Sequence, residues 1–399
     1  MERTEKRRIY AHLPARICAW YAENKRVLPW REDKDPYKIW VSEIMLQQTR
    51  VEAVRPYFAR FLQELPDVEA LAACPEEKLL KLWEGLGYYS RVRNMQKAAG
   101  QLTEESRPAV LPQDPKELQK LPGIGIYTAG AIASIAYGVP VPAVDGNVLR
   151  ILARLTADDA DILKASVKRE AEQQLTEVLQ NSVSGSETAG KISAGDFNQG
   201  MMDLGAGVCL PNAQPLCEKC PLADICEAHR AGQETAYPVR KKAKERRVEQ
   251  RTILVIRDGE RVALNRRQNK GLLAGMYEFP NLPGRLSKKE VLLSVAEHAL
   301  EPLHIKKLEP AKHLFSHVEW QMTGYEIRVA GFPDSAGNIN RIEKKPAADT
   351  EESTWFLAGI GQIEKRYPVP SAFKAYAQYL QMKIGSSEMM AESEKTRED

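Results

Sequence analysis

Four cysteines lie close together in this chain, and their spacing constrains what it can fold into more than any other feature. Cys209, Cys217, Cys220 and Cys226 fall within eighteen residues. The chain opens MERTEKRRIY, which has no apolar segment and no small-residue cleavage site for export, so we expect a cytoplasmic protein. Disulfides are rare in that compartment, where a tight group of four thiols more often binds a metal.

The spacing of the four cysteines bears on which metal they bind. Zinc ribbons usually carry two C-x₂₋₄-C pairs far apart in the sequence, whereas here only Cys217 and Cys220 form such a pair. A single loop that wraps one compact, four-cornered object suits an iron–sulfur cluster better. Zinc and unligated core thiols remain the alternatives. Cys18 and Cys74 stand alone in apolar helical context and are expected in the core.

Length and charge set broad limits on the rest of the chain. With 399 residues we expect two or three domains. The longest uncharged stretch, residues 121–144, is interrupted by prolines and glycines, so we expect no membrane span. The net charge of +3 says little about partners. Residues 239–251 are strongly basic, and the last dozen residues are acidic and polar, as in a disordered tail.

The first part of the chain has helical periodicity. Asp35-Pro36 is typical of a helix start, with an N-cap and a proline in the first turn. Asp114-Pro115 predicts a second start, with Glu117 at the capping-box position. The Ser/Gly-rich residues 181–195 predict a long loop.

The second part of the chain has the sequence pattern of β-strands rather than of helices alone. Residues 251–267 predict a strand, an Asp-Gly turn and a second strand. Residues 320–332 and 353–360 also predict strands, around a helix near 288–300. This pattern indicates a second domain of the α+β class. The boundaries we predict are a catalytic region 1–232, a basic linker 233–250, a second domain 251–382 and a disordered tail 383–399.

Leu121-Pro122-Gly123-Ile124-Gly125 joins two predicted helices in a sharp hairpin. Glycines let the backbone approach another molecule, and the N–H groups at the start of the second helix suit a phosphate. No Lys-Ser/Thr pair follows, so a nucleotide triphosphate site is not expected. An ordinary turn between helices is the alternative interpretation.

Two carboxyl groups stand out for their surroundings. Asp145 can cap the helix that follows it, or can serve as a carboxylate beside a developing cation. Glu43 lies on a helix face beside Ile39, Trp40 and Leu46, where burial would raise its pKa and make it a proton donor near neutral pH. The alternative for Glu43 is a side chain at the edge of that face that reaches water.

Together these pieces resemble the helix–hairpin–helix DNA glycosylases, and within their iron–sulfur branch the MutY-type family, which acts on A opposite 8-oxoguanine. The motifs that carry the resemblance are residues 42–49 (SEIMLQQT), 85–91 (GLGYYSR), the hairpin 121–125, 144–147 (VDGN), 197–199 (FNQ) and the four cysteines. The resemblance implies a mainly α catalytic region with a [4Fe-4S] cluster held by those cysteines. It also implies a monomer that binds duplex DNA containing A opposite 8-oxoguanine or G, away from membranes and on the nucleoid if the source is bacterial.

The resemblance also implies a role for individual residues. Glu43 would protonate adenine N7, Asp145 would stabilise the cationic sugar, and Tyr127 and Asn147 would position these groups. The adenine would leave the duplex for a pocket formed by Arg31, Gln199, Trp30, Leu46, Val51 and Met202. Without the family context, Trp30 and Met202 would be ordinary core residues. The expected DNA and lesion contacts are Gln48, Thr49, Leu86, Tyr88, Arg91, Gly123, Gly125, Phe315, Ser316 and His317.

Two features separate this chain from its relatives. Endonuclease III-like relatives use a lysine two residues after the second hairpin glycine as a Schiff-base nucleophile, but here that position is Tyr127, so we expect weak or absent lyase activity. The first gap between the cysteines has seven residues (LPNAQPL) where the family usually has six, and it lacks the usual basic residues. Lys219 is the candidate substitute for a phosphate contact.

The second domain resembles the MutT-like domain of the same family. A Nudix hydrolase would need a helix with Arg-Glu-x-x-Glu-Glu to hold metal, and KKEVLLSVAEHALEPL lacks it. We therefore expect lesion recognition through Phe315, Ser316 and His317, since a hydroxyl can both donate to and accept from 8-oxoguanine. The competing hypotheses are a lyase of the endonuclease III type and a non-catalytic DNA-binding or redox protein.

Overall fold

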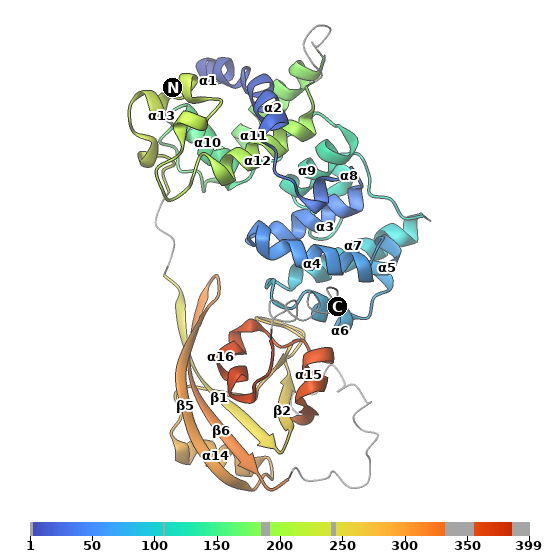
Figure 1. Ribbon diagram of the computed structural model, residues 1–399, viewed down its shortest axis with the longest axis vertical. Helices are drawn as coiled ribbons and strands as arrows, with labels where there is room; N and C mark the ends of the chain where they lie inside the picture. The colour runs from blue at the N-terminus through green and yellow to red at the C-terminus, as the bar shows by residue number, and fades with distance from the viewer. Residues whose placement is uncertain (1–2, 107, 185–191, 241–244, 332–354, 385–399) are drawn as a thin grey trace, which may run out of the picture. The chain divides into compact units, whose positions relative to one another are not determined.

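The computed structural model describes residues 3–106, 108–184, 192–240, 245–331 and 355–384. The chain forms two compact units, which are described separately (Figure 1). The first unit contains residues 1–73 and 94–243, and the second contains residues 74–93 and 244–399. Assigning residues 74–93 to the second unit was not anticipated from the sequence. The domain limits at 232, 250 and 382 stay predictions.

The first unit is built from helices, as its apolar periodicity predicts (Figure 1). The longer ones are α1 (Arg3–Tyr10), α2 (Leu13–Asn24), α3 (Pro36–Leu46), α4 (Val51–Glu64), α5 (Val68–Ala73), α9 (Ile126–Tyr137), α10 (Gly146–Leu155), α11 (Ala165–Ser184) and α12 (Ala194–Gly207). Helix α7 (Ser90–Glu105) begins in the second unit and continues into the first. The short elements are η1 (Pro29–Arg31), α8 (Pro115–Leu118), η2 (Cys217–Lys219), η3 (Ala223–Ile225), α13 (Glu227–Arg230) and η4 (Glu234–Ala236).

The predicted helix starts are confirmed, with one difference in detail. The Asp35 carboxylate accepts from the backbone N–H groups of Tyr37 and Lys38, and Asp114 accepts from Lys116. Glu117 does not close a capping box, because its carboxylate accepts from Lys120 Nζ at 2.6 Å instead. The predicted loop 181–195 begins later than expected, since α11 continues to Ser184. Residues 185–191 of that loop lie outside the described residues.

Helix α12 lies at the centre of the first unit and packs against α2, α9 and α10, while α9 also packs on α3. Its central place follows from its small residues: a Cβ added at Gly200 would lie 2.6 Å from Ile17 of α2. These contacts bring the middle of α3, the first turn of α9, the start of α10 and one face of α12 together. None of the helices in the described part of the chain is long and apolar enough to cross a membrane.

The second unit is built on one mixed sheet, as predicted for an α+β domain. Its strands are β1 (Arg247–Asp258), β2 (Arg261–Arg266), β3 (Tyr277–Glu278), β4 (Asn281–Pro283), β5 (Pro302–Leu314), β6 (Val318–Val329) and β7 (Phe356–Gly359). The strand order is β3-β2-β1-β6-β5, with β4 paired to β1 and β7 paired to β2. Strands β1 and β6 run parallel, and the other pairs are antiparallel. Strand β5 was not predicted, because charged residues interrupt its pattern.

Both faces of this sheet are buried, which explains the nearly continuous apolar run in β1. Ile253 and Val255 face a core shared with α15 (Ile360–Arg366) and α16 (Lys374–Ala377). Leu254 and Ile256 face the opposite core, beneath α14 (Lys288–Glu297). Successive side chains of a strand point to opposite faces, so helices must cover both (Figure 1). The remaining short elements are η6 (Ser371–Phe373) and η7 (Gln378–Leu380).

Residues 74–93, which include α6 (Glu76–Leu82), join this second unit through polar contacts. Tyr277 Oη donates to Glu77 Oε1 at 2.5 Å, and an Arg93 Nη donates to the Ala274 carbonyl at 2.6 Å. Further along the same segment, the Tyr88 and Ser316 hydroxyl oxygens lie 2.6 Å apart. A cut in the linker would therefore divide the second unit between two fragments, with residues 74–93 on the first fragment.

Candidate active site and cysteine centre

Glu43 occupies the middle of α3, and its side chain is buried, with only 6% of the residue exposed. Burial raises the pKa of this carboxyl from 4.5 to about 7, against the opposing effects of a hydrogen bond from Tyr127 and the charge of Arg31. The nearby negative charge of Asp145 raises it further. The prediction of a buried carboxyl with a raised pKa is confirmed. Such a group holds its proton near neutral pH and can donate it.

Tyr127, in the first turn of α9, orients this acid. Its Oη donates to Glu43 Oε2 at 2.9 Å and lies 3.8 Å from the Met202 sulfur on α12. Burial, together with the carboxylates of Glu43 and Asp145, raises the pKa of the phenol well above its usual value. Tyr127 therefore remains a neutral hydrogen-bond donor, and it fixes one carboxyl oxygen while the other stays available.

Asp145 caps helix α10 and faces the same site. Its Oδ1 accepts from the backbone N–H groups of Asn147 and Val148, both at 2.8 Å. Its Oδ2 accepts from the Asn147 side-chain amide at 2.7 Å. Three donors around one carboxylate hold it in a single orientation. The capping interpretation is therefore confirmed, and it is compatible with a role beside a cation.

Asn147 is held in turn by a buried arginine. Arg150 donates to Asn147 Oδ1 at 3.0 Å, to the Gly205 carbonyl at 2.8 Å and to the Cys209 carbonyl at 3.0 Å. Helix α12 approaches closely enough for these bonds because Gly205 has no side chain: a Cβ there would lie 2.7 Å from the Asn147 Cβ. An unbroken series of hydrogen bonds thus joins Asp145 to the first cysteine of the cluster.

Among the predicted pocket residues, Arg31 has the most defined contacts. Its two Nη atoms donate to the Asp203 carboxylate at 2.7 and 3.0 Å, and its guanidinium lies 5.6 Å from the centre of the Tyr21 ring. Trp30 is buried edge-on against Phe58, with ring centres 5.4 Å apart. Half-buried side chains make up the rest of the predicted pocket: Leu46, Val51, Gln199 and Met202. Their roles in holding adenine stay predictions.

The hairpin between α8 and α9 has the expected geometry. Gly123 has a φ of 81°, and a Cβ there would lie 2.7 Å from the Asn94 Cβ, so only glycine fits. Gly125 is the N-cap of α9 and is exposed, with no side chain to satisfy the first N–H groups of the helix. These free donors at a helix N-terminus are suited to a phosphate.

The residues expected to enter the base stack have strained backbones. Gln48, in the first unit, is exposed with a φ of 61°, and Thr49 beside it is half-buried. Tyr88, in the second unit, is 47% exposed with a φ of 47°. Positive φ values in residues other than glycine are uncommon and are concentrated at functional sites.

The other residues of the second unit predicted to meet DNA differ in accessibility. Leu86 is buried, and Arg91 donates to the Leu86 and Gly87 carbonyls while stacking on Trp83 and Tyr88. These residues therefore support the Tyr88 loop from within. Ser316 and His317 are exposed, and Phe315 packs edge-on against Trp320, with ring centres 4.9 Å apart.

The four cysteines line one cavity of the first unit, together with apolar side chains of α10 and α12. Arg154, buried in α10, donates to Cys209 Sγ at 3.2 Å, and its other donors bind backbone carbonyls of residues 210, 234 and 237. Four thiols that converge beside one buried positive charge fit an anionic iron–sulfur cluster. The predicted ligand set is thus brought together in space.

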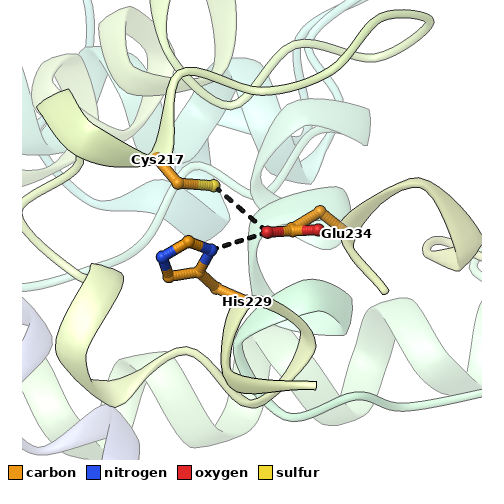
Figure 2. A group of neighbouring side chains, drawn as sticks. All are labelled: Cys217, His229 and Glu234. Atoms are coloured by element: carbon orange, nitrogen blue, oxygen red, sulfur yellow. Dashed lines mark hydrogen bonds and ion pairs between the residues drawn. The ribbon is translucent and has the colours of Figure 1, made fainter. Parts of the chain in front are cut away.

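The side chains of Glu234 and His229 lie next to Cys217 (Figure 2). His229 Nδ1 lies 2.6 Å from Glu234 Oε1, and Cys217 Sγ lies 3.8 Å from the same oxygen. Hydrogen bonding to His229 keeps the pKa of Glu234 below its usual range. Glu234 and His229 line the cavity together with the four cysteines, while Lys219 is exposed.

Several polar residues of the site were not recognised from the sequence. They are Asp203, Arg26, which donates to the Asp203 carboxylate, Arg150, Arg154, His229 and Glu234. One signal was available, because Asp203 is a charged residue within the apolar run MMDLGAGV, four residues after Gln199 on the same helix face. The two buried arginines of α10 gave no such signal. They look like the polar face of an ordinary amphipathic helix until their partners from distant segments are known.

Comparison with known proteins identifies both units. Residues 41–179 match the HhH-GPD superfamily of base excision DNA repair proteins, and residues 252–379 match a NUDIX domain family. The adenine DNA glycosylase of Rattus norvegicus is 35% identical over 373 residues, covering 79% of this chain and 70% of the relative. That of Buchnera aphidicola (from Schizaphis graminum) is 35% identical over 303 residues, covering 75% and 83%. A solved thermostable thymine-DNA glycosylase is 25% identical with a TM-score of 0.47, covering 57% of this chain and 98% of the other.

The helical unit, with its glycine hairpin followed by Asp145, is that of a helix–hairpin–helix DNA glycosylase. The adenine DNA glycosylases match this chain over three quarters of its length or more, and the second unit adds a NUDIX domain to the glycosylase unit. These two findings narrow the family. The chain belongs to the MutY-type family of adenine DNA glycosylases.

Proposed function

We propose that this protein removes adenine from duplex DNA, in base excision repair, by hydrolysing the N-glycosidic bond. The observation that carries the proposal is a buried acid, Glu43, whose pKa is raised to about 7, in the same site as the fixed carboxylate of Asp145. Two carboxyl groups with separate protonation tasks are what glycosidic hydrolysis requires. The relatives are adenine DNA glycosylases, which indicates adenine as the base.

The reaction follows from these two groups. The Glu43 carboxyl donates its proton to adenine N7, and the C1′–N9 bond then breaks with its electron pair moving to the base. The cationic sugar that results is stabilised by the adjacent Asp145 carboxylate. Water adds to C1′, and its proton returns to the Glu43 carboxylate, so the acid is restored. Adenine and an abasic sugar are the products.

The reaction stops at base removal in this proposal. A lyase would need an amine to form an imine with C1′, and the corresponding position holds Tyr127, whose hydroxyl is already engaged with Glu43. A phenol cannot form an imine. This argument favours a monofunctional glycosylase over a lyase of the endonuclease III type, and the presence of both carboxyl groups disfavours a purely DNA-binding or redox protein.

Preference for A opposite 8-oxoguanine, over A opposite G, is assigned to the second unit. Its support is the contact between Tyr88 and Ser316, both of which the family resemblance predicts near the lesion, and whose hydroxyl oxygens lie 2.6 Å apart. A hydroxyl in that position can both donate and accept, so it can distinguish the N7–H of 8-oxoguanine from the bare N7 of G.

We propose that a [4Fe-4S] cluster is held by the four cysteines Cys209, Cys217, Cys220 and Cys226. When bound, it would cross-link residues 209–226 to one another, in the cavity that α10 and α12 also line. Arg154 and Arg150 would then hold Cys209 in place from α10. Arg150 also binds Asn147, so the loop supports the orientation of Asp145.

Base release tests the proposed function directly. Duplexes carrying A opposite 8-oxoguanine, G, C or T are incubated with the full chain, and free base is identified by chromatography. We expect adenine to be released fastest opposite 8-oxoguanine and more slowly opposite G. The product strand should remain unbroken until it is heated in base, and borohydride should trap little covalent complex. Strand cleavage that keeps pace with base release would contradict the monofunctional assignment.

A further inference from the structure

Asp203 carries a buried negative charge that the reaction described above does not use. It lies on α12, and only 2% of its side chain is exposed. Although burial alone would raise its pKa, hydrogen bonds from Arg31 and Arg26 keep the pKa of Asp203 below its usual range. A carboxylate buried to this degree is costly unless its partners are fixed, and Arg31, the more buried of the two arginines, offsets most of this cost.

The two arginines that bind Asp203 differ in their geometry and in their exposure to solvent. Arg31 binds it through both Nη atoms, at 2.7 and 3.0 Å, which is the bidentate geometry of a guanidinium on a carboxylate. Arg26 completes its shell with Nε at 2.8 Å, Nη at 2.5 Å and its backbone N–H at 3.3 Å. Arg26 is 39% exposed in its side chain, whereas Arg31 is 11% exposed. The inner partner is thus the arginine predicted to read adenine.

The side chains next to Asp203 point to the same site. Met202, its neighbour on α12, lies 3.8 Å from the Tyr127 hydroxyl that binds Glu43. The charge of Arg31 lowers the pKa of Glu43, so the guanidinium acts on the acid across the pocket. The Asp203 carboxylate binds this same guanidinium.

We propose that Asp203 is a positioning residue, which holds Arg31 in the adenine pocket and sets how much of its charge reaches Glu43. The inference rests on the proposed function. With Asp203 in place, the Arg31 fork is anchored at one end, and its remaining N–H groups keep a constant direction toward the bound base. Without it, Arg31 is free to turn toward Glu43 and favour the ionised form of the acid, which cannot donate a proton.

The test is a pH profile of adenine release under single-turnover conditions, in the full chain with its cluster. The groups that face Glu43 are Tyr127 from α9, Arg31 from η1 and Asp145 at the start of α10. Activity requires the protonated acid, so wild-type rates should fall as pH rises through about 7. Asp203→Asn should lower the rate roughly tenfold or more at neutral pH and move this alkaline limb to lower pH.

Two further variants separate positioning from general stability. Asp203→Glu keeps the charge and should restore the position of the limb and most of the rate. Asp158→Asn removes a partly buried carboxylate that pairs with Lys6 at 2.5 Å, elsewhere in the same unit. This matched control should leave both the rate and the limb unchanged.

Arg26→Ala covers the case in which Asp203→Asn does not fold. This substitution truncates a partly exposed side chain, so Arg31 becomes the one arginine that binds Asp203. Because the Asp203 charge is then no longer shared with Arg26, it offsets the Arg31 charge more completely. The limb should then move to higher pH, with the rate at neutral pH within roughly threefold of wild type.

The outcomes separate the inference from the proposed function. A shift to lower pH in Asp203→Asn, reversed in Asp203→Glu, supports the inference. A folded Asp203→Asn protein whose rate falls equally at every pH overturns it, because Asp203 would then be a structural tie only. A limb that does not move upward in Arg26→Ala also overturns it. If the wild-type protein releases no adenine, the proposed function fails and this inference with it.

Discussion

Replacing Glu43 with glutamine should abolish turnover and, above neutral pH, make the protein more stable. Glutamine has the shape and hydrogen-bonding capacity of the protonated acid, and its carbonyl oxygen can still accept from Tyr127. It cannot give a proton to adenine. A positioned general acid typically contributes about 10²–10⁴-fold, so we expect the rate of base release to fall at least that far while DNA binding is retained.

The stability gain follows from the pKa of Glu43. Burial raises it from 4.5 to about 7, so between these pH values the folded protein holds a proton that the unfolded chain has released. Stability therefore falls as pH rises through this window, by up to about 3 kcal/mol at roughly 1.4 kcal/mol per pH unit. Below pH 4.5 both states hold the proton and this penalty vanishes. The glutamine variant carries no such penalty at any pH.

Thermal unfolding of wild type and variant at about pH 5 and pH 8 measures this difference. The two proteins should differ little at the lower pH. At the higher pH the variant should melt several degrees above wild type, since a unit of this size gains about 2–4 °C per kcal/mol. Glu52→Gln is the matched control, because its side chain is 82% exposed on the neighbouring helix α4. A gap between variant and wild type that is equal at both pH values would refute the reasoning.

Three further substitutions and one metal analysis test other parts of the site. Asp145→Asn should bind DNA but lose at least about 10²-fold in base release, since the cationic sugar loses its counter-charge; a rate within roughly threefold of wild type would remove Asp145 from the mechanism. Anaerobically purified protein should be yellow-brown, with about four iron atoms per chain. Stoichiometric zinc without colour would reject the cluster, and Arg154→Gln should bleach faster in air if Arg154 steadies Cys209. Ser316→Ala should lose part of the preference for 8-oxoguanine over G, roughly threefold to tenfold, with base release opposite G unchanged; full retention of the preference would place lesion reading elsewhere.

Local sequence patterns predicted the elements whose causes are themselves local. Asp35, Asp114 and Asp145 cap helices because an aspartate before an apolar run satisfies the N–H groups of the first turn. Glu43 on an apolar helix face is buried because the face that carries it must pack against α9.

Features that depend on distant partners could not be predicted in this way. Strand β5 is an edge strand with one buried residue among many exposed ones, so its alternation is weak. The place of residues 74–93 in the second unit depends on pairs such as Tyr277 with Glu77, which are 200 residues apart. The same holds for Asp203, since its arginines lie more than 170 residues earlier in the chain.

The central claim is that Glu43 delivers its proton to N7 of adenine, and a substrate without that nitrogen lone pair tests it most directly. In 7-deazaadenine, placed opposite 8-oxoguanine, a C–H group replaces N7 and leaves the rest of the base unchanged. The account predicts that the wild-type protein binds this duplex within roughly threefold of the adenine duplex but releases the base at least about 10²-fold more slowly. Release of 7-deazaadenine at a rate close to that of adenine would contradict the account, because the bond would then break without a proton from Glu43 at N7.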